Sequence, residues 1–273
     1  LRNYAMERFL ERLSASKYRN CFILKGGMLI SAMVGIDSRA TMDIDTTLRN
    51  YPLNCESAEQ IVRQIADVEI DDKISFVIKK TEEIMEDSEY QGVRLSLDAY
   101  LDKTRIPLKI DISTGDVITP CEISFSYQLM FENRTIPLLA YPPETVLAEK
   151  LETILSRGEA NTRLRDFYDV YILQREDFVV TPDALCHALL ATCRKRGHED
   201  LLHTYASILN EVRQSGAMRA QWMKYQTDFD YAAGITWDTV LDTVETLCMK
   251  TLDDHAFGDE LPQEKSQFEM HLL

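Results

Sequence analysis

Phe22-Ile-Leu-Lys-Gly-Gly-Met28 and Thr41-Met-Asp-Ile-Asp45 are the segments that say most about the fold of this chain. The first is a short apolar run that ends in two glycines, and the second has two aspartates at positions i and i+2. Alternate residues of a strand point to the same side, so Asp43 and Asp45 are expected to aim both carboxylates at one spot. Two carboxylates near a glycine-rich turn from strand to helix suit a divalent metal and a phosphate. An Asp-x-Asp pair alone is more typical of a solvated loop, but the glycines and a further acid downstream favour the functional interpretation.

That further acid, Asp111, lies in a second strand pattern. Aliphatic residues alternate with other residues over 106–112, and the same alternation runs over 92–100. The five residues between the two runs are few enough for a hairpin. Asp111 then lies on the opposite face of its strand from the isoleucines and is available to a cleft. Taken alone, it is equally typical of an exposed acid on a sheet face.

The periodicity predicts an α+β chain in two parts. Up to about residue 140, helices at 2–14 and 57–68 are mixed with strands at 21–24 and 43–48. After Pro142 the pattern is helical almost throughout, with helices at 144–156, 164–174 and 237–249 and another that Thr181 opens and Gly197 closes. We expect one domain at 1–140 and a helical domain at 141–273 that closes the cleft, with 253–273 as a loosely packed tail. A chain of 273 residues with 45% hydrophobic content can bury two cores.

The net charge of −15 argues against a broad nucleic-acid surface. Residues 1–140 carry 17 basic and 22 acidic side chains, and 141–273 carry 13 and 23, so the excess acid lies mostly in the helical half. Any bound RNA is expected to meet a small basic rim near Arg157–Arg165. The acidic remainder could face a basic partner protein, which the sequence alone does not establish.

Other candidate sites are weaker, and the composition points to a cytoplasmic protein. His198 and His203 are five apart, whereas the zinc-protease arrangement needs histidines at i and i+4. The six cysteines show neither a Cys-x-x-Cys motif nor metal-finger spacing, which fits a reducing cytosol. No segment approaches the apolar length needed to cross a membrane, and no secretory leader is visible.

These motifs, taken in their order, resemble the nucleotidyltransferase superfamily that includes DNA polymerase beta, and more narrowly the AbiEii/AbiGii toxin family. The narrower resemblance rests on Leu24-Lys-Gly-Gly-Met28, Arg39-Ala-Thr-Met-Asp-Ile-Asp45 and Lys109-Ile-Asp111. It continues through Pro143-Glu-Thr-Val-Leu-Ala-Glu-Lys-Leu-Glu152, Arg157-Gly158 and Asn161-Thr-Arg-Leu-Arg-Asp-Phe-Tyr-Asp169. It covers roughly residues 1–175. The resemblance implies a polymerase-beta-like core, a mixed sheet with flanking helices, followed by an all-helical C-terminal domain.

The resemblance also implies a metal-dependent enzyme and a role for each matching residue. The implied metal ligands for Mg²⁺ or Mn²⁺ are Asp43, Asp45 and Asp111, which with Asp166 form the catalytic set, and the implied nucleotide contacts are Gly26, Gly27, Thr41 and Lys150. Many superfamily members have Gly-Ser at the turn, whereas the second residue here is Gly27. That change removes a hydroxyl that could contact phosphate and leaves the backbone N–H groups to do so.

Two of these residues have structural alternatives. Without the resemblance, Lys150 is more typical of a surface lysine that pairs with Glu144 or Glu149 along its helix. Asp166 is flanked by Arg163 and Arg165, so a purely structural cluster of salt bridges competes with a functional role.

The function that follows is transfer of a nucleoside monophosphate from an NTP to a hydroxyl. An RNA 3′ end, particularly that of tRNA, is the first choice of acceptor, a protein hydroxyl the second and a small molecule the third. The family implies a bacterial toxin of a toxin–antitoxin or abortive-infection system with a separately encoded antitoxin. The alternative from another class is a non-catalytic nucleotide-binding scaffold, and the intact acidic triad counts against it.

Overall fold

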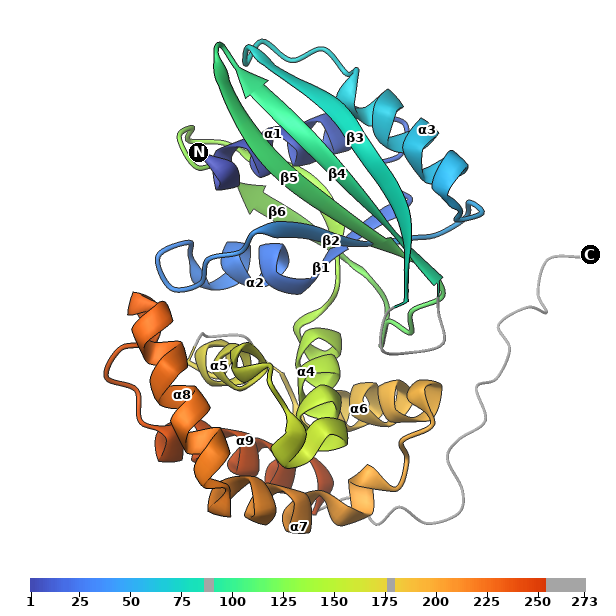
Figure 1. The fold of residues 1–273 in the computed structure, drawn as a ribbon. Helices are drawn as coiled ribbons and strands as arrows, with labels where there is room; N and C mark the ends of the chain where they lie inside the picture. Colours follow the sequence, from blue (N-terminus) through green and yellow to red (C-terminus); the bar gives the residue numbers. More distant parts are fainter. Residues whose placement is uncertain (86–90, 176–179, 254–273) are drawn as a thin grey trace, which may run out of the picture.

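A seven-stranded mixed sheet forms the first half of the molecule, with strand order β3-β4-β5-β2-β1-β7-β6 (Figure 1). The computed structural model describes residues 1–85, 91–175 and 180–253. The β1–β7 and β2–β5 pairs are parallel and the other neighbours antiparallel. The strands are β1 (Phe22–Lys25), β2 (Asp43–Leu48), β3 (Ile74–Met85), β4 (Gln91–Leu101), β5 (Thr104–Ser113), β6 (Ile123–Gln128) and β7 (Thr135–Ala140). The mixed sheet and its flanking helices confirm the α+β fold class.

Three helices flank the sheet. α1 (Arg2–Ala15) and α3 (Cys55–Ala66) pack on one of its faces and contact each other (Figure 1). α3 begins at a capping box, in which Asn54 accepts from the Ser57 N–H and the Ser57 hydroxyl accepts from the Asn54 N–H. α2 (Gly26–Val34) follows β1 without a loop and contacts the helical half through α5. This arrangement leaves the β1–α2 turn facing the helices.

The second half is helical, as the periodicity predicted. Its helices are α4 (Pro143–Arg157), α5 (Leu164–Leu173), α6 (Pro182–Arg196), α7 (Leu201–Gln214), α8 (Gly216–Asp228) and α9 (Trp237–Leu252), with short 3-10 turns η1 (Gly158–Ala160) and η2 (Asp230–Ala232). Thr181 caps α6 by accepting from the Ala184 N–H, and Gly197 ends it at φ 69°, so both predicted helix signals are confirmed. The last strand ends at Ala140 and α4 begins at Pro143, but the division into two domains stays a prediction. The predicted tail, beyond residue 253, lies outside the described residues.

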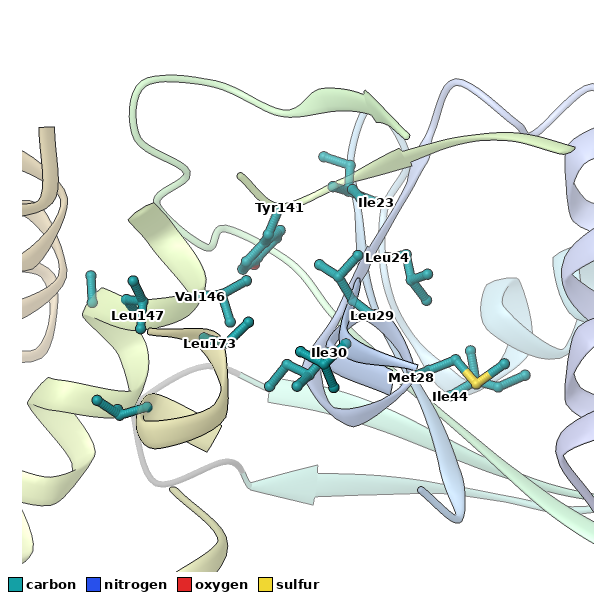
Figure 2. Close-up of a cluster of buried hydrophobic side chains, with 14 of the residues drawn as sticks. Ile23, Leu24, Met28, Leu29, Ile30, Ile44, Tyr141, Val146, Leu147 and Leu173 are labelled. Atoms are coloured by element: carbon teal, nitrogen blue, oxygen red, sulfur yellow. The ribbon is translucent and has the colours of Figure 1, made fainter. Parts of the chain in front are cut away.

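A continuous apolar cluster joins the two halves (Figure 2). Ile23 and Ile30 come from β1 and α2, while Val146 and Leu173 come from α4 and α5, and each is at most 3% exposed. Burying side chains of this size contributes roughly 1.5–3 kcal/mol each. The position of α4 and α5 relative to the sheet is therefore set by a shared core.

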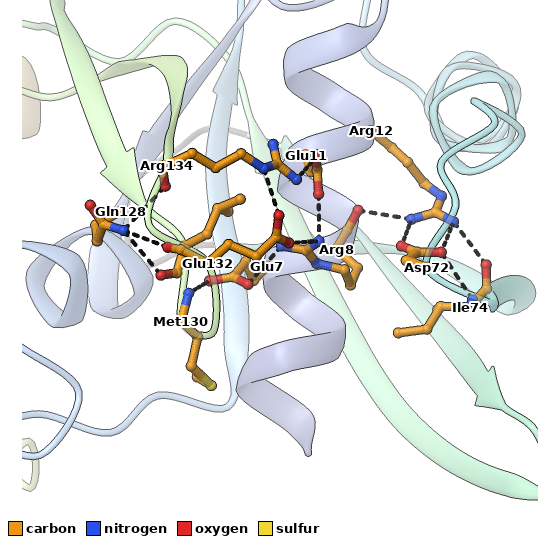
Figure 3. Close-up of polar contacts among 11 residues, drawn as sticks. Glu7, Arg8, Glu11, Arg12, Asp72, Ile74, Gln128, Met130, Glu132 and Arg134 are labelled. Atoms are coloured by element: carbon orange, nitrogen blue, oxygen red, sulfur yellow. Dashed lines mark hydrogen bonds and ion pairs between the residues drawn. The ribbon is translucent and has the colours of Figure 1, made fainter.

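Charged side chains on α1 are buried against the sheet (Figure 3). The Arg12 guanidinium donates to the Asp72 carboxylate at 2.5 and 2.8 Å and to the Ile74 carbonyl at 2.8 Å. Burial alone would raise the pKa of Asp72, but the hydrogen bonds from Arg12 and the Ile74 N–H outweigh it, so the pKa lies below its usual 3.8. The Arg12–Asp72 pair thus fastens α1 to the start of β3.

Candidate active site

The turn between β1 and α2 accepts only glycine at its first position. Gly26 has φ +63°, in the left-handed region, and a Cβ there would lie 2.7 Å from the carboxylate carbon of Asp45. The next N–H, that of Gly27, donates to Asp45 Oδ2 at 3.4 Å. The first turn of α2 is thereby held directly against one of the predicted metal ligands.

Gly27 is also closely packed, and its neighbour is the hydroxyl of Thr41. A Cβ at position 27 would lie 2.6 Å from Thr41 Oγ1, which is closer than real Cβ contacts come. The Thr41 hydroxyl donates to the Asp43 carbonyl at 3.4 Å. Thr41 therefore fills the space that a side chain at position 27 would need, which gives a physical reason for Gly-Gly in place of Gly-Ser.

The predicted carboxylates converge through strand pairing. The parallel register of β2 and β5 places Asp45 opposite Asp111, and Asp43 precedes Asp45 by two residues on the same strand. Burial, and then the negative charges of Asp111 and Asp43, raise the pKa of Asp45 to about 6, while Lys25 and the Gly27 N–H act in the opposite direction. Negative charge is thus concentrated at this spot.

Asp111 has a partner that the sequence analysis did not assign. Arg94 of β4 donates to both of its oxygens, from Nε at 2.7 Å and from Nη2 at 2.6 Å. Asp111 lines the cleft, as predicted, but it is buried there and held by a guanidinium. The apolar pattern could have revealed the pair, since matching Val93 with Ile112 across the hairpin places Arg94 opposite Asp111.

The carboxylates suit a hard divalent cation at Asp43 and Asp45. Both supply oxygen ligands of the kind that Mg²⁺ and Mn²⁺ prefer, and Asp45 lies opposite a third carboxylate, that of Asp111. Within the described ranges, no three His, Cys, Asp or Glu side chains are already grouped as a metal site. Asp111 is engaged by Arg94. Metal binding by the three aspartates stays a prediction.

Lys150 lies across the cleft on α4. Its ammonium pairs with Asp166 Oδ1 at 2.5 Å and with Asp169 Oδ2 at 3.1 Å, and its side chain is only 19% exposed. Burial would lower the pKa of Lys150, but the charges of Asp166 and Asp169 outweigh this and hold the pKa above its usual 10.5. Lys150 is therefore part of the cleft wall. Its partner Asp166 lies in an ion-pair cluster, so a structural role remains compatible with the geometry.

Asp169 also binds the segment that leads into β2. Arg39 Nε and Nη2 donate to it at 2.6 and 3.2 Å, and the exposed fractions of the two side chains are 2% and 0%. Nearby, the Tyr168 hydroxyl donates to the Ser38 carbonyl at 2.6 Å. The sequence analysis gave neither Arg39 nor Asp169 a site role, and 130 residues separate them. One carboxylate thus links Lys150 to the chain just before Asp43.

All eight predicted site residues line one cavity of about 1190 Å³ between the sheet and the helices. They are Gly26, Gly27, Thr41, Asp43, Asp45, Asp111, Lys150 and Asp166. The helical wall adds basic side chains that include the predicted rim, namely Arg157, Arg163, Arg165, Arg196 and Lys224. Acidic and basic side chains occur on both walls of the cavity, with the three predicted metal ligands on the sheet side and the larger number of basic groups on the helical side. The individual roles stay predictions.

Comparisons with known proteins identify the family and the fold of this chain. The family model of the nucleotidyl transferase AbiEii toxin, Type IV TA system, matches residues 8–243. The crystal structure of JHP933 from Helicobacter pylori is similar at TM-score 0.50 and 15% identity, covering 93% of each chain. An antigenic nucleotidyltransferase-like protein from Paracoccidioides brasiliensis gives TM-score 0.42 and 13% identity, covering 73% of this chain and 90% of that one. No curated protein matches the chain in sequence. The likeness to JHP933 shows a shared fold.

Proposed function

Because the chain belongs to the AbiEii nucleotidyl transferase toxin family of type IV toxin–antitoxin systems, we propose that it transfers a nucleoside monophosphate from an NTP to a hydroxyl group. The observation that carries this proposal is the meeting of three elements in one cavity. The Gly26-Gly27 turn and Asp43 with Asp45 lie on the sheet side, and Lys150 lies on the helical side.

The proposed role of the turn and of Lys150 is to hold the triphosphate. The first N–H groups of a helix lack partners within the helix and attract anions, and at α2 no side chain at positions 26 or 27 stands in the way. Lys150 would neutralise phosphate charge from the opposite wall, where partial burial makes its attraction larger than in water. Asp166 would hold the ammonium in place.

Asp43 and Asp45 are the proposed ligands of Mg²⁺ or Mn²⁺. The chemistry that a bound divalent cation supplies in such a site is stabilisation of the attacking and leaving oxygens during an in-line displacement. Asp111 would either complete the ligand set or accept the proton of the attacking hydroxyl. Its position opposite Asp45 supports both roles.

We propose an RNA 3′ end, particularly that of tRNA, as the acceptor. The basic groups along the helical wall of the cavity support a polyanion, and the net charge of −15 of the whole chain favours a narrow contact over a broad one. A protein hydroxyl is the second choice. The biological setting that we propose is a bacterial cytoplasm, where a separately encoded antitoxin would oppose the toxin. In the described part of the chain, no helix has the length and apolar character of a membrane span.

The acceptor can be identified by incubating the protein with each α-labelled NTP, total RNA and cell lysate. We expect label on RNA, and less of it with Arg163→Ala, which changes the cavity wall, than with the control Arg219→Ala. The Arg219 side chain is 46% exposed and pairs with Asp238 at 2.9 Å. Label on protein alone would overturn the RNA acceptor. Bound nucleotide with no label on either would favour the non-catalytic scaffold.

A further inference from the structure

The Arg94–Asp111 pair lies where the third carboxylate of the proposed site is needed. The two residues face each other directly across the β4–β5 hairpin, and both line the cavity. The guanidinium binds both oxygens of Asp111 in a fork, with Nε at 2.7 Å and Nη2 at 2.6 Å. The Arg94 side chain is 34% exposed, whereas that of Asp111 is 11% exposed. The arginine is therefore the partner that can move without opening the core.

A second arginine–aspartate pair on the same hairpin provides a comparison. Arg105 Nε lies 2.9 Å from Asp98 Oδ2, with exposed fractions of 63% and 3%. This pair is nearer the hairpin turn, which follows Leu101, and neither residue lines the cavity. The hairpin thus carries one such pair inside the proposed site and one outside it.

A guanidinium and a metal ion compete for one carboxylate. A forked pair uses a lone pair on each oxygen, and a divalent cation at the same oxygens would also lie within a few ångströms of the guanidinium charge. Two positive charges at that separation repel strongly in a partly buried site. Asp111 can therefore bind a cation well only after Arg94 has moved.

We propose that Arg94 is a positioning residue that withholds Asp111 from a divalent cation until a triphosphate enters the cleft. This inference rests on the proposed function, which supplies the triphosphate. Arginine binds phosphate oxygens with the same forked geometry as carboxylate oxygens, so the incoming triphosphate offers Arg94 an equivalent partner. Entry of the nucleotide then releases Asp111 beside Asp45, and the site becomes complete only with substrate present.

This exchange makes the protein bind nucleotide and metal cooperatively. The cooperativity adds to the affinity that any NTP has for the metal in solution. By linkage, removal of Arg94 should strengthen metal binding to the protein alone and weaken its dependence on nucleotide. A purely structural role for Arg94 would change neither quantity.

Mn²⁺ binding, followed by electron paramagnetic resonance, tests this on the full chain with and without non-hydrolysable α,β-methylene analogues of the four ribonucleotides. Without nucleotide, Arg94→Ala should bind Mn²⁺ about tenfold more tightly than wild type, which corresponds to about 1.4 kcal/mol. Arg94→Lys should lie between them because it keeps the charge without the fork, and the control Arg105→Ala should match wild type. Adding Asp111→Asn to Arg94→Ala should abolish the gain, and thermal melting checks that each variant is folded.

The inference is overturned if folded Arg94→Ala binds Mn²⁺ as wild type does, or if Arg105→Ala shifts the affinity equally. In either case, nucleotide binding by the wild type would leave the proposed function standing. If wild type and variants bind none of the analogues even with Mn²⁺, the proposed function fails and the inference falls with it.

Discussion

Asp169→Asn removes the charge of a carboxylate that is completely buried between two cations. Arg39 lies 2.6 Å from one of its oxygens and Lys150 lies 3.1 Å from the other. The cationic partners outweigh burial and keep the pKa of Asp169 below its usual 3.8, so the folded protein holds it ionised at neutral pH. Breaking a buried pair by removing one partner costs about 3–5 kcal/mol, and here the buried Arg39 would lose its carboxylate partner while Lys150 keeps its pair with Asp166. We therefore expect Asp169→Asn to lose about that much stability.

This loss is large against the roughly 5–15 kcal/mol by which folded proteins are stable. Urea denaturation followed by circular dichroism measures it. The matched control is Asp242→Asn, whose carboxylate pairs with Arg213 at 2.6 Å but is 64% exposed, so its loss should stay below about 1 kcal/mol. A loss for Asp169→Asn as small as that of the control would refute the reasoning. It would mean that the buried Arg39 does not depend on this carboxylate.

Three further predictions concern the turn, the lysine and the pH dependence of stability. Gly27→Ser should weaken nucleotide binding because its Cβ would meet the Thr41 hydroxyl, and it should weaken binding less when Thr41→Ala is already present. Calorimetric titration of wild type, the two single variants and the double variant can check this. Lys150→Ala should weaken NTP binding and slow transfer by about tenfold or more, with partial rescue by Lys150→Arg, measured by single-turnover labelling. Asp72→Asn should lower the free energy of unfolding at neutral pH. Urea melts should show that the difference in this free energy from wild type vanishes as the pH falls through the lowered pKa of Asp72. A group with a depressed pKa stabilises the fold at pH values above its unfolded pKa, usually 3.8, and this stability is lost when protonation ends the pairing with Arg12.

Each of these has an outcome that contradicts it. Equal nucleotide affinity for Gly27→Ser and wild type would mean that Thr41 moves aside easily. Unchanged kinetics in Lys150→Ala would return this lysine to a structural role within its ion-pair cluster. A stability difference for Asp72→Asn that persists in acid would point to lost packing or hydrogen bonding instead of the charge pair.

The site could be predicted in part because its signals are local. Alternation fixed the β2 bounds, Asp43–Leu48, and the Thr181 and Gly197 signals gave the limits of α6, since caps and apolar periodicity depend on neighbouring residues. The bounds of α7 and α8 were not predicted. Only Ser215 separates the two helices, and a single serine is a weak signal for the end of a helix.

Contacts between distant parts of the chain limit how much of the site could be predicted from the sequence. The pairing of Arg94 with Asp111 follows from the hairpin register and was within reach of the sequence. The Arg39–Asp169 pair was not, because it depends on how α5 packs against the segment before β2. Such packing depends on the whole buried core, so the spacing of residues along the sequence does not predict it.

The most direct test of the central claim is calorimetric titration of NTP and Mg²⁺ into wild type and into the Asp43→Ala, Asp45→Ala double variant. Replacing both carboxylates should leave the fold nearly as stable as before, since burial and the nearby acids already disfavour the charge on Asp45. The account predicts metal-dependent binding of at least one NTP by wild type and its loss in the folded double variant. Unchanged metal-dependent affinity in that variant would contradict the account, because the nucleotide and its cation would then bind elsewhere.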